Sequence, residues 1–380
     1  MYKNLAATLV AACVIAPAAA PSWAQTPAAP QPSPSTPAQS AAQQQVPVKA
    51  AFVYVTPVLP AGWTRQHEDG RLQLERDLKG QVQTTAVDNV PEGADTERVL
   101  RDLATQGHQL IFTTSFGYME PTLRVAKDFP NVKFENITGY KQAANVATAN
   151  ARHYEGRYLS GIAAARMSQT GVAGFVAGFP IPEVVQGINA FALGMRSVNP
   201  QAQVKVVWLN SWFDPARERE AAMTLMDQSA DVLSFQVAST AVMAAAQERG
   251  KMAIAFHSDM RNDGPDAQLL AVTHHWGQYY ANRAKAVQNG TWLAGDTWGG
   301  VKEGMVKVEH FGPKLPQAVR QELLARQKDM AAGRLQPFAA VKADVRDNQG
   351  QVRIPQGTQA SDGQLHEMNW LVEGVVGSVQ

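Results

Sequence analysis

Short apolar segments of strand length alternate with segments of helical periodicity through most of this 380-residue chain. In the helical segments the apolar residues fall three and four positions apart, as on one face of an amphipathic helix. Nine segments are predicted as strands, at residues 49–55, 82–89, 109–114, 132–138, 172–177, 204–209, 231–237, 252–256 and 269–273. Strands that alternate with helices in this way predict an α/β protein with parallel sheets covered by helices on both faces.

The number of these units bears on the domain organisation. The predicted helices lie at residues 71–80, 97–107, 121–130, 155–169, 183–198 and 217–228. More than six strand–helix units, with a change of character after Asn150, favour two doubly wound lobes, and the chain length suits about two domains. A barrel of eight units is an alternative on the count alone. No short-period internal repeat is apparent.

The residues just after each predicted strand are candidates for ligand binding, because ligands of doubly wound sheets bind beyond the carboxyl ends of the strands. Nearly every one of these loops carries an aromatic ring close to a polar group. The candidate ligand-binding residues are Trp63, Ser115, Phe116, Phe179, Trp212, Asp214, His257, Asp259, His274 and Trp276. Packing alone would scatter such rings over both ends of the sheets, so their repetition at one edge favours a ligand site.

Each of these candidates also has a structural explanation. A single Trp or Phe beside a strand is at least as often a core residue as a ligand contact. Asp214 and Pro215 form a common pair of N-cap and first helical residue. His274 and His275 do not predict a metal site, because adjacent residues on a strand point to opposite faces and no third ligand is suitably spaced. We therefore expect no metal.

Motifs of common catalytic and nucleotide-binding sites are not found. The sequence has no G-x-S-x-G, H-E-x-x-H or G-x-x-x-x-G-K-[ST] motif, and no G-x-G-x-x-G follows a strand. Without a loop that cradles phosphate, nucleotides are poor candidates. A formal net charge of +1, without a basic stripe, argues against nucleic acid as a partner. Flat rings with a few carboxylates and imidazoles suit a planar, nitrogen-rich ligand, and no cofactor is expected.

The first 24 residues have the features of a secretory signal peptide. Lys3 precedes an apolar stretch at 5–20, and residues 22–24 form a small-x-small cleavage signal. The apolar stretch is interrupted by Pro17 and is shorter than the ~20 residues that span a membrane. Cleavage after Ala24 predicts a periplasmic protein without cysteine.

A lipid anchor is the second alternative for the N-terminus. Residues 10–13 resemble a lipoprotein cleavage box that would leave Cys13, the sole cysteine, as the first mature residue. Apolar residues follow Cys13, where a lipoprotein normally turns polar, so this alternative ranks second. Residues 25–47 are rich in Pro, Ala, Ser and Gln and predict a disordered linker to a folded body that starts near Val48.

Eight ordered segments of the chain resemble the basic membrane protein (BMP) family, the substrate-binding proteins of ABC importers. They are GWTRQHEDGR, NVPEGADTERVLRDLATQG, TTSFGYMEPTLRVAKDFP, ARHYEGRYLSG, GFPIPEVVQGINAFALGMRSVNP, NSWFDPAREREAA, HSDM and DTWGGVKEGMVKV. The resemblance runs from about Val48 to Val376. It implies a type I periplasmic binding protein fold, in which two lobes joined by a hinge with three crossovers close on a ligand. It also implies purine-type ligands, since characterised relatives are purine nucleoside receptors.

The resemblance assigns roles to some of the candidates. Trp63 stands where relatives place a base-stacking Phe, and Phe179 and Trp212 match other aromatic pocket positions. Asp214 and Asp259 match acidic positions of the family pattern in their loops.

Three departures from the family pattern concern the positions that would hold ribose hydroxyls. Residues 61–64 lack the acid and the amide that nucleoside-binding relatives carry in the first loop. His257 stands where relatives carry an Asp, and residues 274–276 stand where they often carry a Lys. We therefore expect a free purine base or a similar heterocycle at least as readily as a nucleoside.

Together these observations predict an exported, monomeric solute-binding protein, not an enzyme, that delivers a purine-like small molecule to the membrane permease of an ABC transporter. Lobe 1 is expected at residues 48–153 with about 276–300, and lobe 2 at 154–275 with about 301–380. Alternatives are a receptor for another heterocycle or a sugar, and a nucleoside hydrolase that uses Asp214 or Asp259. A further alternative is a sensor subunit that passes closure to a signalling partner.

Overall fold

The computed structural model describes residues 12–13, 16, 18–19 and 46–379. Most of the predicted signal peptide and most of the predicted linker therefore lie outside the described residues, although Cys13 is among those described and is exposed. One compact unit spans Gln45–Gln380.

The first sheet contains six strands that are parallel throughout. Their order across the sheet is β11 (Asp296–Gly299), β5 (Val146–Ala151), β4 (Lys133–Ile137), β3 (Leu110–Thr113), β1 (Val48–Val53) and β2 (Val82–Val87). The side chains of β1 alternate between two cores. Ala50 and Phe52 face one core, whereas Ala51 and Val53 face the other. Both faces of this sheet are therefore covered.

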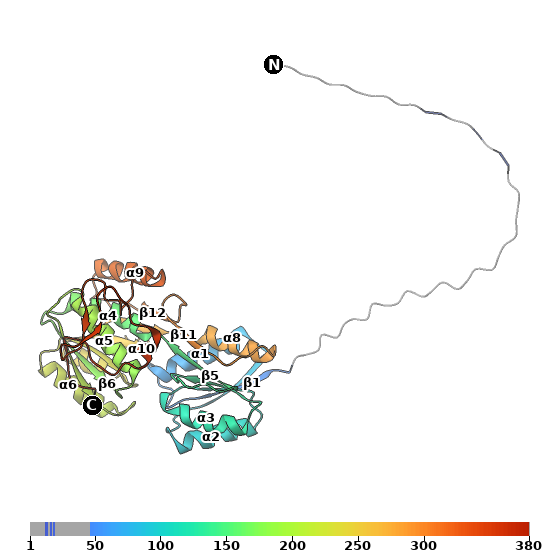
Figure 1. Ribbon diagram of the computed structural model, residues 1–380, viewed down its shortest axis with the longest axis horizontal. Coiled ribbons are helices and arrows are strands. Elements are labelled where there is room, and N and C mark those ends of the chain that lie inside the picture. Colours follow the sequence, from blue (N-terminus) through green and yellow to red (C-terminus); the bar gives the residue numbers. More distant parts are fainter. Residues whose placement is uncertain (1–11, 14–15, 17, 20–45, 380) are drawn as a thin grey trace. The chain divides into compact units, whose positions relative to one another are not determined.

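Four helices and one short 3₁₀ turn accompany this sheet. They are α1 (Trp63–Asp77), α2 (Ala94–Thr105), η1 (Phe116–Tyr118), α3 (Met119–Asp128) and α8 (Gly277–Gln288). Helices α2 and α3 cover one face, and α1 and α8 lie together on the other (Figure 1). Helices on both faces are the arrangement expected for buried parallel strands.

The second sheet contains seven strands, of which only β12 runs antiparallel to its neighbour β10. Their order is β12 (Val306–Glu309), β10 (Gln268–His274), β9 (Met252–His257), β8 (Val232–Gln236), β6 (Val172–Ala177), β7 (Gln203–Trp208) and β15 (Val375–Val376). The accompanying helices are α4 (His153–Met167), α5 (Pro182–Arg196), α6 (Pro215–Asp227), α7 (Ala241–Glu248), α9 (Gln317–Ala331) and α10 (Asp362–His366). A separate hairpin pairs β13 (Val345–Arg346) with β14 (Val352–Ile354).

The chain passes between the two sheets three times. Strands β1 to β5 belong to the first sheet and β6 to β10 to the second, after which β11 returns to the first sheet and β12 to the second. The crossings lie after β5, after β10 and after β11. This confirms two doubly wound sheets with three crossovers, and the eight-unit barrel is wrong because the strands form two open sheets.

All nine predicted strands are present, but several others were not predicted. Strand β5 has the sequence VATANA, whose small and polar residues do not give a strong strand pattern, and β11 and β12 have only four residues each. These strands are stabilised by neighbouring strands rather than by local preference.

Helices α4 and α5 pack closely because glycine lies at their contact. A Cβ on Gly161 would lie 2.1 Å from the carbonyl oxygen of Phe191, and a Cβ on Gly194 would lie 2.0 Å from that of Tyr158. This close approach holds the N-termini of α4 and α5, with His153 and Glu183, in a fixed relation.

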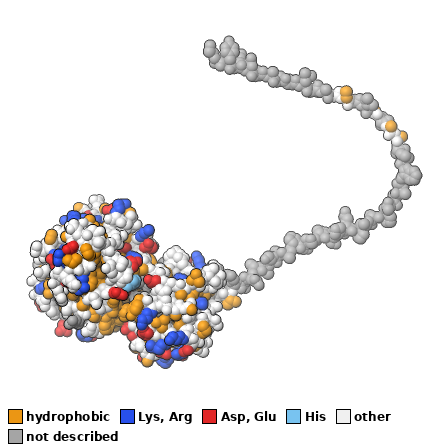
Figure 2. Space-filling view, viewed as in Figure 1, with side chains coloured by type: hydrophobic (Ala, Val, Ile, Leu, Met, Phe, Trp, Pro, Cys, Tyr) orange, Lys and Arg blue, Asp and Glu red, His pale blue; other side chains and the backbone are white. Residues whose placement is uncertain are grey.

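The visible surface carries interspersed basic and acidic side chains rather than a broad area of one sign (Figure 2). On α2 and α3, for example, Arg101 pairs with Glu97 and Asp128, and Arg124 also pairs with Glu97. Exposed pairs of this kind contribute little to stability.

Candidate ligand-binding site

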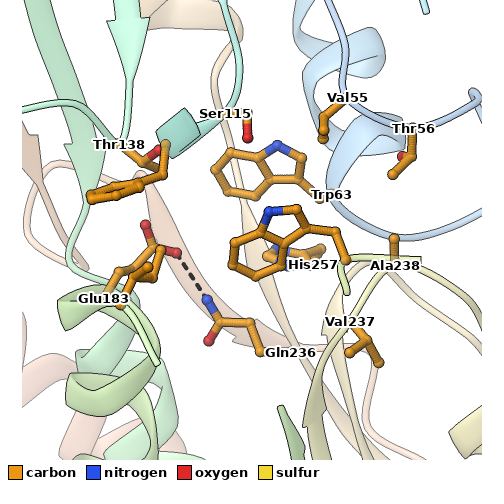
Figure 3. Close-up of a pocket in the computed structure, with 13 residues that line it drawn as sticks. Val55, Thr56, Trp63, Ser115, Thr138, Glu183, Gln236, Val237, Ala238 and His257 are labelled. Carbon is orange, nitrogen blue, oxygen red and sulfur yellow. Dashed lines mark hydrogen bonds between the residues drawn. The ribbon is translucent and has the colours of Figure 1, made fainter. Parts of the chain in front are cut away.

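A cavity lies where the carboxyl ends of strands from both sheets meet (Figure 3). The empty space within it, including the part open to solvent, is about 470 Å³. The lining residues are Val55, Thr56, Trp63, Ser115, Phe116, Thr138, Ile181, Glu183, Trp212, Gln236, Val237, Ala238 and His257. All belong to the ends of strands, to the loops that follow them or to the first turn of the next helix, so the topology brings them together.

Trp63 enters the cavity from the first turn of α1. Its Nε1–H donates a hydrogen bond to the carbonyl oxygen of Thr114, with 2.7 Å between nitrogen and oxygen. Its ring meets the rings of His67 and His257 nearly edge to face, at centroid distances of 4.2 and 5.2 Å. These contacts orient the indole as a wall of the cavity.

Trp212 lies in the loop after β7 and is partly exposed. The Trp212 ring can pack here because glycine directly follows β6. A Cβ on Gly178 would lie only 2.6 Å from Cε3 of Trp212. Phe179 contacts the Trp212 ring at a centroid distance of 4.9 Å. Phe179 does not line this cavity. It packs against Trp212, which does.

Phe116 and Ser115 come from the end of β3. The Ser115 hydroxyl donates to a carboxylate oxygen of Glu92, and the Ser115 carbonyl accepts from Nδ2 of Asn136 at 3.2 Å. These bonds hold the short turn η1, which places Phe116 at the cavity and near Tyr140, with ring centroids 6.0 Å apart.

Glu183 is the ionisable carboxyl group among the lining residues. It lies in the first turn of α5, and its carboxylate accepts a hydrogen bond from Nε2 of Gln236 at 2.9 Å (Figure 3). It also accepts one from Nδ2 of Asn150 at 3.2 Å. Burial raises the pKa of Glu183 to about 7, although these two amides and the positive charge of Arg157 act to lower it. Glu183 therefore changes its charge near neutral pH.

His257 forms part of the same wall as Glu183. It is the last residue of β9 and has a left-handed φ of 70°, which is uncommon for a residue with a side chain. Its Nδ1 lies 2.8 Å from Nδ1 of His274. The other ring nitrogen, Nε2, has no hydrogen-bond partner among residues 46–379 but is not closed off from the cavity.

Two acidic candidates have other contacts. Asp214 is the N-cap of α6: its carboxylate accepts from the backbone N–H of Arg217 at 3.1 Å, and its own N–H donates to Glu218 at 3.1 Å. Asp259 pairs with Arg261 at 2.6 Å and accepts from Gln268. Neither lines the cavity, and a ligand role for them stays a prediction.

His274 and Trp276 are buried next to the cavity instead of lining it. His274 lies between His153 and His257, and Trp276 packs against His67 and Tyr280. Together with Asp259, both residues line a second hollow, whose other lining residues include Glu309 and His310. Their ligand contact likewise stays a prediction.

Sequence reasoning missed four polar lining residues, the larger Glu183 and Gln236 and the smaller Thr56 and Thr138. A signal for Glu183 was present, since it ends the segment GFPIPE that follows β6 directly. Gln236 ends a strand that is otherwise a continuous buried run, and a polar residue at that position is unusual. The smaller lining residues carry no signal in the sequence.

Two further observations concern metal-binding groups and membrane-spanning helices. In the part of the chain that the structure describes, no group of three or more His, Cys, Asp and Glu side chains is placed to hold a metal ion. Within the same residues, no helix has both the length and the apolar character that crossing a bilayer requires.

Two solved structures with the same architecture come from ABC transporter systems. One from Aeropyrum pernix superposes with a TM-score of 0.64 at 20% identity, over 78% of this chain and 94% of that one. One from Conexibacter woesei gives 0.63 at 19% identity, over 76% and 98%. Both are named as solute-binding proteins of ABC transporter systems. The fold is therefore the type I periplasmic binding protein fold.

The sequence comparisons identify the family. Residues 47–343 match the family model described as ABC transporter substrate-binding protein PnrA-like, and the chain belongs to this family, the Bmp family. A purine-binding protein of Brucella abortus is 46% identical over 88% of this chain and 95% of its own length. A protein of Haloferax volcanii, provisionally named as an ABC transporter glucose-binding protein, is 33% identical over 87% of this chain and 81% of its own.

Proposed function

We propose that this ABC transporter substrate-binding protein captures a free purine base in the aromatic cavity between its two sheets and delivers it to a membrane permease. The observation that carries this proposal is the composition of the cavity: Trp63, Phe116 and Trp212 supply flat rings, and Glu183 and His257 supply hydrogen-bonding groups. Stacking on such rings is worth ~1–3 kcal/mol per base.

Free bases are preferred over nucleosides in this proposal for two reasons. The loop at residues 61–64 offers no acid or amide for ribose hydroxyls. In addition, the carboxylate of Asp259 accepts hydrogen bonds from Arg261 and Gln268, and Asp259 does not line the cavity. The Brucella abortus relative is named for purine binding, which supports the same ligand class.

Capture is proposed to occur by closure of two lobes, residues 48–153 with about 276–300 and residues 154–275 with about 301–380, about the three crossovers. The N-terminal signal peptide would place the protein outside the cytoplasm, where a permease can receive the ligand. The same cavity could accept a sugar, since the Haloferax volcanii relative carries that name and sugars also stack on aromatic rings.

The test is a ligand screen by thermal shift followed by titration calorimetry, using adenine, hypoxanthine, guanine, their nucleosides and glucose. A ligand at 100 times its Kd should add about 2.7 kcal/mol of stability. The proposal expects a base to bind most tightly. Nucleosides that bind at least tenfold tighter than every base, or glucose alone binding, would contradict it.

Incubation with inosine and adenosine, followed by chromatography, separates binding from hydrolysis: the proposal expects no released base.

A further inference from the structure

Three histidine side chains form a hydrogen-bonded row inside the protein that joins two polar points of the cavity wall. His257 Nδ1 lies 2.8 Å from His274 Nδ1, and His274 Nε2 lies 2.7 Å from His153 Nδ1. The remaining nitrogen of His153, Nε2, makes no hydrogen bond within the described residues, and the atom of Glu183 that it faces, Oε1, lies 3.5 Å away. The row therefore starts at His257 and ends beside Glu183, and both of these residues line the cavity.

All three imidazoles are neutral at physiological pH. Their side chains are almost completely buried, and this burial lowers the pKa of His153 to about 3 and the pKa values of His257 and His274 well below the ordinary 6.5. The nearby Arg157 guanidinium acts in the same direction on all three. A neutral imidazole has one N–H donor and one acceptor nitrogen, so the direction of each hydrogen bond in the row depends on the next.

Only two arrangements of protons satisfy both imidazole–imidazole bonds. In the first, His257 donates from Nδ1 to His274, and His274 donates from Nε2 to His153. The N–H on Nε2 of His153 then faces Glu183, and Nε2 of His257 presents an acceptor to the cavity. In the second, every bond is reversed: Nε2 of His153 is an acceptor that faces Glu183, and Nε2–H of His257 presents a donor to the cavity.

The charge on Glu183 selects between the two arrangements. A carboxylate at 3.5 Å attracts an N–H on His153 Nε2 and favours the first, whereas a neutral carboxylic acid that turns its O–H toward His153 Nε2 favours the second. No imidazole becomes charged in either state, and the proton count changes only at Glu183. The pKa of Glu183, raised by burial to about 7, makes both states accessible near neutral pH.

The other groups around this row bond to Glu183 itself or have partners of their own. Glu183 is faced by Asn150 from β5, Gln236 from β8 and Arg157 from α4. Arg157 is itself bonded to the Ser234 hydroxyl and the Phe235 carbonyl. His67 from α1 lies near the row, but its Nδ1 is bonded to the Tyr280 hydroxyl and it is neutral, because burial lowers its pKa well below 6.5.

We propose that His153 and His274 are specificity-determining positioning residues, which transmit the protonation state of Glu183 to Nε2 of His257. The site then offers a hydrogen-bond acceptor to the ligand when Glu183 is ionised and a donor when Glu183 is protonated. A heterocycle that presents a ring N–H to His257 is favoured above neutral pH, and one that presents a ring nitrogen lone pair is favoured below it.

The direct test is ¹⁵N NMR of the ligand-free protein, because long-range ¹H–¹⁵N spectra distinguish the two neutral tautomers of histidine. We expect His153, His257 and His274 to exchange tautomers together between pH 6 and 8, with one common midpoint and without forming imidazolium. Glu183→Gln should abolish the exchange. The inference is overturned if each histidine keeps one tautomer over this range, if one of them becomes charged in it, or if Glu183→Gln leaves the exchange intact.

A ligand measurement extends the test and rests on the proposed function. The Kd of adenine should change about tenfold between pH 6 and 8, because only one tautomeric state binds a given ligand edge and its population changes about tenfold. His274→Phe, which fills the same space but interrupts the row, should remove this pH dependence. His108→Gln is the matched control, since His108 is buried and hydrogen-bonded to Thr85 and Leu103, away from the cavity, and this variant should keep the wild-type profile.

The two measurements separate the two proposals. Absence of adenine binding counts against the proposed function. The NMR experiment then still tests whether the three histidines exchange tautomers together. A pH-independent Kd in the wild type, or an unchanged pH dependence in His274→Phe, would overturn the coupling. If His274→Phe does not fold, the wild-type and Glu183→Gln spectra remain decisive.

Discussion

Trp212 and Trp63 line the same cavity from elements that belong to different sheets. Trp63 starts α1 beside the first sheet, and Trp212 follows β7 of the second. A planar ligand that contacts both rings therefore connects the two halves of the molecule. At the residue scale, the indole of Trp212 is the group whose loss should separate binding from folding, because it is only partly buried.

Trp212→Ala is expected to weaken purine binding by ~1–3 kcal/mol while the free energy of unfolding changes little. Titration calorimetry and urea unfolding measure the two quantities. Trp208→Ala is a matched control: Trp208 lies on the same β7 segment and donates from Nε1 to the Ser378 carbonyl at 2.7 Å, but it does not line the cavity. An affinity that drops equally in both variants would show that the ring acts only through folding.

At the scale of single elements, the start of α6 shows how a residue with a plausible ligand role can have a structural one. The Asp214 carboxylate caps the helix through the N–H of Arg217, and Glu218 accepts the N–H of Asp214 in return. Pro215, at the first helical position, has no backbone N–H and so leaves no donor there without a partner. These contacts account for the motif without any ligand.

Asp214→Ala should therefore lower the free energy of unfolding by about 1 kcal/mol, and Asp214→Asn should leave it nearly unchanged, because Asn caps a helix as well as Asp. Neither variant should alter affinity for adenine. Chemical denaturation and calorimetry on the same preparations provide the check. A loss of ~1.5–3 kcal/mol of binding in Asp214→Asn would instead assign the carboxylate to the ligand.

At the scale of the whole molecule, Gly62 joins elements of the two sheets at the edge of the cavity. Its N–H donates to the Ser258 hydroxyl at 3.0 Å, and a Cβ would lie 2.6 Å from the carbonyl oxygen of Ala238. Its φ is 98°, a conformation that favours glycine. Contact between the loop before α1 and the loops after β8 and β9 thus depends on the missing side chain.

Gly62→Ala should weaken ligand binding and reduce the ligand-induced decrease in radius of gyration measured by small-angle scattering, because the added methyl group separates these loops. Gly80→Ala is the matched control. Gly80 also has a positive φ, of 78°, but a Cβ there meets nothing within 4 Å. Equal losses of affinity in both variants would attribute the effect to backbone strain alone and contradict the role in closure.

Glu183 also links the stability of the whole molecule to pH. Burial raises its folded-state pKa from 4.5 to about 7, so the folded protein binds a proton in this interval that the unfolded chain has released. Stability from this group is thus fully present below pH 4.5 and is lost as the pH rises through 7. The loss is on the order of 3 kcal/mol.

Glu183→Gln should remove this contribution. Urea unfolding at pH 5 and pH 8 should show a smaller decrease in stability with rising pH for the variant than for the wild type. The comparison between the two proteins isolates Glu183 from Glu135, Glu155 and Glu218, whose pKa values burial also raises. A variant with the same pH slope as the wild type would show that Glu183 titrates in its ordinary range.

The sequence predicted the placement of some cavity residues better than others. Trp63, Ser115, Phe116, Trp212 and His257 were predicted from their positions after strands, and these residues do line the cavity. That prediction depends only on the rule that parallel strands end at one edge. His274 and Trp276 follow a strand as well, but the rule does not say to which side of the strand end a side chain points.

The sequence by itself determined the class of fold, because the periods of apolar residues are set by local backbone geometry and require no knowledge of distant partners. The family segments, read in order, also predicted two lobes with three crossovers. Only the tertiary structure decided which strand joins which sheet, as for the four residues of β11, and it alone decided that Glu183, His153, His274 and His257 form one row. These residues are up to 121 positions apart in the sequence. Their contact depends on the packing of α4, α5, β9 and β10 against one another, and such long-range packing leaves no local pattern in the sequence.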